Sequence, residues 1–228
     1  MKRLATDRSS DEVLLEGPRV VLQAVAAGVH LDLLALREGD QLAVAADRTV
    51  FLSRGLFRDL SQTSTPQGVL ALGHASLATA AAAIDAARSA GWPLLVLDRV
   101  QDPGNVGAIA RTAAAAGAPA LAVLAGTADP FGAKAIRASA GHVFNLVVAE
   151  AEWQDLEGLR CLGASPAGTP LDEADLTSAG ALVLGSEAHG LSREVDTVSL
   201  PMAAGVESLN VAAAAAILLY EVRRRIAA

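Results

Sequence analysis

Polar side chains that could perform chemistry interrupt the apolar pattern of this chain at three places. The first follows the apolar run 94–97, where Asp102-Pro103-Gly104-Asn105 is expected to lead into a helix. Such a turn leaves backbone N–H groups and the Asn105 amide at the carboxyl edge of a sheet, which suits a polar or anionic ligand. Arg111 follows among small apolar neighbours and needs a counter-charge or an anion. Taken singly, the two residues also fit an N-cap asparagine and a solvated arginine.

The second place is the segment Gly185-Ser186-Glu187-Ala188-His189-Gly190, which follows another apolar run. Its glycines allow a ligand to approach the backbone closely, and Glu187 can accept hydrogen bonds. His189 has no further ligands at a metal-binding spacing, so the pattern favours an exposed loop histidine. We therefore expect no metal site.

The third place lies between a short apolar strand and a long alanine-rich helix. Pro201 ends the strand, small residues follow, and Ser208 and Asn210 stand where the helix begins. By local rules Ser208 is the N-cap. The five alanines at 212–216 make a flat helix face, which permits close packing against another element or a second subunit.

The elements that must position these segments form two series. The first series predicts a small α/β domain that ends near His74, with strands at 13–15, 33–36, 50–52 and 69–72 and helices at 19–27 and 53–60. After a helix at 76–90, strands and helices alternate, which predicts a parallel sheet. Its strands are expected at 94–97, 120–124, 143–148, 159–162, 181–184 and 198–200, and its helices at 106–116, 131–140, near Trp153 and at 209–226.

Composition and charge exclude several classes of protein. Of the 228 residues, 52% are hydrophobic and 19% are charged, which excludes general disorder. The net charge of −7 argues against nonspecific coating of nucleic acid but permits a local basic surface. No apolar run is long enough to span a membrane, and the first residues lack the apolar region of a secretory signal. The single cysteine, Cys161, fits a reducing compartment, so we expect a cytoplasmic protein.

Taken together, the three segments resemble the motifs of the SpoU (TrmH) family of S-adenosylmethionine-dependent RNA ribose methyltransferases. The resemblance rests on the order and spacing of Asp98-x-x-Gln101-Asp102-Pro103-Gly104-Asn105-x-Gly107-x-x-x-Arg111-Thr112, Gly185-Ser186-Glu187-x-x-Gly190-Leu191, and Pro201-Met202 through Ser208-Leu209-Asn210-Val211. It extends to residues 131–141. Upstream, Glu16-Gly17-Pro18-Arg19 and Thr65-Pro66-Gln67-Gly68 are similar to the family's small L30e-like RNA-binding domain.

This resemblance implies an α/β fold with a trefoil knot at the C-terminal end, typical of the SPOUT superfamily. Residues 1–75 would form the L30e-like domain and residues 76–228 the methyltransferase domain. S-adenosylmethionine would contact backbone groups of Gly185, Leu200 and Leu209. The residues that map onto the family's polar catalytic residues are Asn105, Arg111, Glu187, Ser208 and Asn210. Arg111 would assist the ribose hydroxyl.

The resemblance also implies an RNA partner, ribosomal or transfer RNA, and a homodimer paired through the second domain. Phosphate contacts are expected from Arg19, Arg54, Arg58 and Arg137. Three alternatives remain open: a catalytically silent RNA-binding or ribosome-assembly protein of the same fold, a resistance methylase that acts on ribosomal RNA, and a base methyltransferase of the wider superfamily. The intact polar residues argue against the first, and the three motifs argue against the last.

Overall fold

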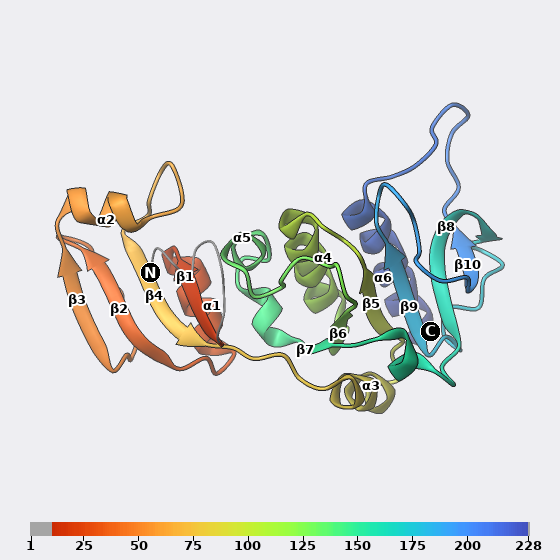
Figure 1. Cartoon of the computed structure of the whole chain (residues 1–228), viewed down its shortest axis with the longest axis horizontal. Helices are drawn as coiled ribbons and strands as arrows, with labels where there is room; N and C mark the ends of the chain where they lie inside the picture. Colours follow the sequence, from red (N-terminus) through yellow and green to blue (C-terminus); the bar gives the residue numbers. More distant parts are fainter. Residues whose placement is uncertain (1–10, 228) are drawn as a thin grey trace.

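The computed structural model describes residues 11–227, so the expectation that the N-terminus carries no secretory signal lies outside the described part. Its first series of elements builds a four-stranded sheet. The elements are β1 (Glu12–Glu16), α1 (Pro18–Ala26), β2 (Leu31–Arg37), β3 (Arg48–Leu52), α2 (Arg54–Leu60) and β4 (Val69–His74). The strand order is β1-β4-β2-β3, with β2 and β3 parallel and the other pairs antiparallel. Figure 1 shows this sheet at one end of the molecule.

The second series builds a six-stranded parallel sheet in the order β10-β8-β9-β5-β6-β7. Its elements are α3 (Ala80–Ser89), β5 (Leu94–Asp98), α4 (Pro103–Ala116), β6 (Ala120–Val123), α5 (Ala133–Ala138), η1 (His142–Asn145), β7 (Val147–Glu150), η2 (Trp153–Leu156), β8 (Cys161–Pro170), β9 (Ala181–Gly185), β10 (Asp196–Ser199) and α6 (Val211–Ile226). From β5 the chain first adds β6 and β7 on one side and later adds β9 on the other. The order therefore reverses between β5 and β9, and ligands of open parallel sheets bind at such a switch point.

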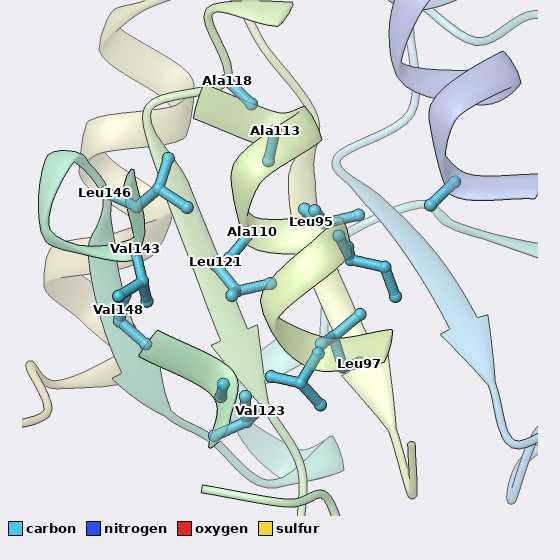
Figure 2. Packing of buried hydrophobic residues seen from close by; sticks show 14 of the residues in the cluster. Leu95, Leu97, Ala110, Ala113, Ala118, Leu121, Val123, Val143, Leu146 and Val148 are labelled. Atoms are coloured by element: carbon cyan, nitrogen blue, oxygen red, sulfur yellow. The ribbon is translucent and has the colours of Figure 1, made fainter. Parts of the chain in front are cut away.

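Helices cover both faces of the parallel sheet. Side chains of β5 alternate, so that Leu95 and Leu97 join the core cluster containing α4, whereas Leu94 and Val96 join the cluster containing α3. Figure 2 shows Leu95, Leu97 and Leu121 packed beside Ala110 of α4. Small residues on α4 allow this close packing. A β-carbon on Gly107 would lie 2.2 Å from the Ala135 carbonyl oxygen, so only glycine lets α4 and α5 approach this far.

The two sheets meet where α5 and η1 face the first series. Glu16, at the end of β1, is 5% exposed, and its carboxylate accepts hydrogen bonds from the Gln62 and Thr63 N–H groups and from the Thr63 hydroxyl. Arg137 of α5 donates to Gln62 Oε1 at 2.7 Å and lies 3.6 Å from Glu16. Gln23 of α1 donates to Asn145. These polar contacts tie the first series to the helix that packs on α4.

The predicted α/β fold with a parallel sheet is confirmed, with several corrections. The strand expected at 143–148 is wrong in its first half, because Gly141 takes a left-handed conformation and starts the 3-10 helix η1, so that β7 begins only at Val147. The helix near Trp153 is also 3-10. The N-terminus of α4 lies three residues earlier than expected. In the described range, no helix combines the length and apolar character needed to cross a membrane.

Candidate active site

The carboxyl ends of β5 and β9 lie side by side, because Asp98 and Gly185 are partners in the register of the two strands. Each strand leads directly into one of the segments that the sequence singled out. Asp102 caps α4 by accepting the Gly104 N–H at 3.0 Å, and Lys134 lies 2.7 Å from the same carboxylate oxygen. These hydrogen bonds, that of Lys134 first, lower the pKa of Asp102. Asn105 therefore lies within the first turn of α4 and is not its cap.

A cavity of about 400 Å³ opens beside the end of β9. Its lining comes from five places in the chain: the bulged part of β8, the end of β9 with the loop that follows it, β10, the segment between β10 and α6, and the first turns of α6. The lining residues are Ala164, Ser165, Pro166, Leu184, Gly185, Ser186, Glu187, Gly190, Val198, Leu200, Met202, Ser208, Leu209, Asn210, Val211 and Ala214. Most of them are apolar, and Glu187 is the sole charged residue among them.

Three polar side chains from three segments form a hydrogen-bonded chain at the rim of this cavity. Asn105 of α4 donates through Nδ2 to Glu187 Oε1, and Asn210 donates through Nδ2 to Asn105 Oδ1 at 3.1 Å. The Asn210 Oδ1 atom also accepts the Ala212 and Ala213 N–H groups, so Asn210 is the N-cap of α6. The expected cap, Ser208, instead lines the cavity. Because the cap fixes the Asn210 amide, its Nδ2 group is held toward Asn105.

The loop that carries Glu187 is a tight turn. Ser186 and Gly190 exchange two backbone hydrogen bonds of 3.1 and 2.9 Å, and the Ser186 hydroxyl accepts the His189 N–H. A β-carbon on Gly185 would lie 2.4 Å from the Gly190 backbone, so the loop folds back directly over this glycine. His189 is exposed, as a plain loop residue would be.

The structure brings together most of the predicted site residues but not all of them. Gly185, Leu200, Leu209, Glu187, Ser208 and Asn210 all line the cavity, and Asn105 contacts two of them. Arg111 does not line the cavity; it lies exposed on α4, and within residues 11–227 its guanidinium has no hydrogen bond or ion pair. Of the predicted phosphate contacts, Arg19, Arg54 and Arg58 are exposed, whereas Arg137 is only 26% exposed and bound to Gln62.

Comparison with protein families decides the identity of this site. Residues 93–220, which include β5, α4, β9 and most of α6, match the model of the SpoU rRNA Methylase family. The chain belongs to the SpoU rRNA methylase family. Over 97% of its length it is 32% identical to the 23S rRNA (guanosine(2553)-2'-O)-methyltransferase RlmP of Bacillus subtilis, of which it covers 94%.

Solved structures of SpoU methyltransferases share the architecture. The chain resembles AviRb from Streptomyces viridochromogenes in complex with AdoMet, with a TM-score of 0.83 and 26% identity over 100% of this chain and 96% of AviRb. It also resembles the AdoMet-bound rRNA methyltransferase from Sinorhizobium meliloti, with a TM-score of 0.80 and 28% identity over 95% of this chain and 88% of the other. The α/β fold with a parallel sheet is thus that of SPOUT methyltransferases.

Sequence reasoning missed two parts of the SpoU site. The first is the wall formed by Ala164, Ser165 and Pro166. Residues 164–168 bulge out of β8, because its pairing with β10 jumps from Gly163 opposite Thr197 to Thr169 opposite Val198. The Ser-Pro pair in a strand was the available signal for a bulge. The second lies behind the Glu187 loop and outside the cavity lining: Asp98 stands in the first motif, but its carboxylate, which is buried, was given no role.

Proposed function

We propose that this SpoU family member transfers the methyl group of S-adenosylmethionine to a ribose 2'-hydroxyl of RNA, with ribosomal RNA as the substrate class. The observation that carries the proposal is the hydrogen-bonded chain of Asn105, Glu187 and Asn210 at the rim of a mostly apolar cavity. A relative that covers nearly the whole chain methylates a ribose of 23S rRNA by its name, which supports the same reaction here.

The cavity fits S-adenosylmethionine in size and in lining. A volume of about 400 Å³ lies within the range of small-molecule pockets. The apolar side chains of Leu184, Leu200 and Leu209 suit the faces of an adenine ring, and backbone groups beside Gly185 can recognise its edge. When bound, S-adenosylmethionine supplies an electrophilic methyl group on a sulfonium. We assign the backbone of Gly185, Leu200 and Leu209 to cofactor binding.

The polar residues at the rim have to align the ribose hydroxyl and relieve it of its proton. In the proposed mechanism Glu187 accepts hydrogen bonds from bound groups, while Asn105 donates to its carboxylate and Asn210 holds Asn105 in place. Ser208 lines the same cavity and adds a hydroxyl. Arg111 has no partner among the described residues, which supports a role toward the RNA: holding the hydroxyl and its neighbouring phosphate through its planar fork.

For the chain as a whole, we infer an L30e-like substrate domain at residues 1–75 and a methyltransferase domain at 76–228 with a C-terminal trefoil knot. The separate four-stranded sheet, which ends at His74, supports the division. The close match with SPOUT methyltransferases along the full chain supports the knot. Such a knot is an exception to the usual unthreaded connections of proteins.

RNA capture is assigned mainly to the first domain. Arg54 and Arg58 of α2 lie exposed close in sequence to Phe51, which is 63% exposed, and a basic surface with an aromatic side chain suits phosphates and unpaired bases. Arg19 and Arg137 are the other proposed phosphate contacts. An RNA substrate supports the expected cytoplasmic location.

The second domain is proposed to form a homodimer through α6. Ile217 and Tyr220 lie on the exposed side of this helix, 45% and 52% exposed, and Leu209 adds exposed apolar surface just before its start. Large apolar side chains gathered on one side of a helix indicate an interface. Light scattering of the protein at micromolar concentration should show a dimer, and Tyr220→Glu should give monomers. A monomeric unmodified protein would exclude this assembly.

The decisive test of the function compares ribosomal and transfer RNA from cells with and without the gene. Purified protein with labelled S-adenosylmethionine should methylate RNA from the deleted strain and leave RNA from the parent strain unlabelled. Nucleoside analysis should place the label on ribose. Binding of RNA without transfer would establish the silent alternative, and label on a base would move the protein to another branch of the superfamily.

A further inference from the structure

A buried carboxylate lies behind the Glu187 loop and has no part in the site as proposed. Asp98, the last residue of β5, is 1% exposed. Its Oδ2 atom accepts the Ser192 N–H at 2.5 Å, and its Oδ1 atom lies 3.5 Å from Arg99 Nε. A buried charge is costly unless it is paired and hydrogen-bonded. The hydrogen bond from the Ser192 N–H therefore stabilises the ionised Asp98 carboxylate and is charge-assisted.

The same serine is held from a second direction. Trp153 of η2 donates from its indole Nε1 to the Ser192 hydroxyl at 2.8 Å. The guanidinium of Arg193 lies 5.9 Å from the centre of the Trp153 ring. Ser192 is thus bound through its backbone to β5 and through its side chain to η2, two elements that are far apart in the sequence.

The residue that follows Asp98, Arg99, has a strained backbone. Arg99 has φ of +58°, a left-handed conformation that is unfavourable for a residue with a β-carbon. Its Nε atom is buried and has no hydrogen-bond partner within residues 11–227. Strain of this kind is retained where surrounding structure requires it, and it concentrates at functional sites. Here it places a guanidinium beside the Asp98 carboxylate.

We propose that Asp98 is a positioning residue of the methyl-transfer site, acting through Ser192 to fix the loop that carries Glu187. The loop leaves the sheet at Gly185, which is the strand partner of Asp98, and Asp98 binds its far end at Ser192. Both ends of the loop are therefore held at one point of β5. Glu187 lies between these ends, in the turn that Ser186 and Gly190 close, so holding the far end at Ser192 keeps this turn, and with it the Glu187 carboxylate, at Asn105.

The proposal rests on the proposed function for its kinetic test but not for its structural test. Asp98→Asn keeps the size of the side chain and removes the charge that faces Ser192 and Arg99. In the protein alone, hydrogen exchange of the amides at 186–192 should become at least about tenfold faster, because the charge-assisted bond at Ser192 is lost. Asp85→Asn on the exposed side of α3 is the matched control and should change nothing.

The kinetic test is a double-mutant cycle with Glu187→Gln, measured as single-turnover methyl transfer to RNA. Asp98→Asn alone should slow transfer at least about tenfold, since small misplacements of catalytic groups have effects of this size or larger. In the Glu187→Gln background it should add less than about twofold, because the residue it positions is already disabled. An additive effect would show a general loss of stability and overturn the proposal, as would unchanged transfer.

Two further variants cover the remaining outcomes. If Asp98→Asn does not fold, Trp153→Phe, which removes the indole N–H, and Ser192→Ala should each speed exchange of the loop amides and slow transfer a few-fold. Unchanged exchange in both would reject the proposal. If the unmodified protein methylates no RNA, the proposed function fails, and the exchange of the loop amides alone decides whether Asp98 holds the loop.

Discussion

At the scale of single residues, the site separates two tasks. Glu187, Asn105 and Asn210 form one hydrogen-bonded chain at the cavity rim, whereas Arg111 lies on α4 with no partner in the described range.

Arg111→Ala should therefore lower single-turnover transfer roughly a hundredfold or more and leave S-adenosylmethionine affinity unchanged, because the side chain does not line the cavity. Arg111→Lys should be nearly as inactive, since lysine lacks the planar fork. Calorimetry with the cofactor and rapid-quench kinetics check both, with Arg88→Ala as an exposed control; lost cofactor binding would contradict the assigned role.

Asn210 carries two tasks in one side chain, and a single substitution separates them. An aspartate at this position could not donate to Asn105, but a carboxylate caps a helix as well as an amide does. We expect Asn210→Asp to unfold at the same temperature as the original protein and to transfer methyl groups at least about tenfold more slowly. Asn210→Ala should also lose about 1 kcal/mol of stability. Thermal unfolding and activity measurements on the Asn210→Asp and Asn210→Ala variants check both expectations. Equal stability of the two variants would show that capping by residue 210 does not stabilise α6.

At this scale the sequence predicted the participants better than their roles. Asn105, Glu187 and Asn210 are recognisable because each interrupts an apolar run at the end of a strand or the start of a helix. The N-caps of α4 and α6 were misassigned. The structure shows that Asp102 caps α4 and Asn210 caps α6, rather than Asn105 and Ser208. Asp98 opens the first motif, but the sequence assigned its carboxylate no role. Its importance comes from Ser192, 94 residues away, and no spacing rule reaches that far.

At the scale of elements, the Glu221 carboxylate stabilises the packing of α6, and this stabilisation is lost at acidic pH. Glu221, 16% exposed, accepts hydrogen bonds from Arg224 and Arg225, and these lower its pKa to about 2. Arg225 also donates to the Leu171 and Ala174 carbonyl groups, so the pair fixes α6 to the chain after β8. Because the folded pKa lies below the usual value, the stabilisation is complete above about pH 5 and is lost as the pH falls toward 2.

Glu221→Gln should consequently destabilise the protein by about 1–2 kcal/mol at pH 7. The difference in unfolding free energy between the two proteins should shrink steadily between about pH 5 and pH 2, because the carboxyl group of the original protein becomes protonated there. Urea unfolding of both proteins at several pH values measures this difference in free energy. A difference that stays constant with pH would mean that packing of the side chain, rather than its charge, stabilises the helix.

Most elements of the second series could be predicted because continuous apolar runs such as 94–97 and 181–184 suit fully buried parallel strands. The bulge at 164–168 could not, since it depends on which residues of β10 pair with β8. The 3-10 helix η1 was missed for a related reason. Val143 belongs to the core cluster that contains α4, and the partly buried Phe144 packs against this cluster and stacks on Phe131, so neither side chain needs strand pairing to be covered.

At the scale of the whole molecule, α5 contacts the four-stranded sheet, to which RNA capture is assigned, and also packs on α4, which carries Asn105. Arg137→Ala should lower both the unfolding temperature and RNA affinity, because it removes a partner of the Glu16 and Gln62 side chains as well as a proposed phosphate contact. Arg54→Ala should lower affinity alone and reduce the salt dependence of binding by about one phosphate contact. RNA affinity measured at several salt concentrations and calorimetric unfolding of both variants test this contrast. An unchanged unfolding temperature of Arg137→Ala would contradict it.

The walls of the cavity come from residues 164–214, whereas the four-stranded sheet is complete at His74. During synthesis, the surface proposed to recognise RNA can therefore form well before any pocket for the methyl donor exists. A chain cut before α6 would still present that surface. Such a fragment is expected to bind RNA without modifying it and so to compete with the full-length protein for its substrate.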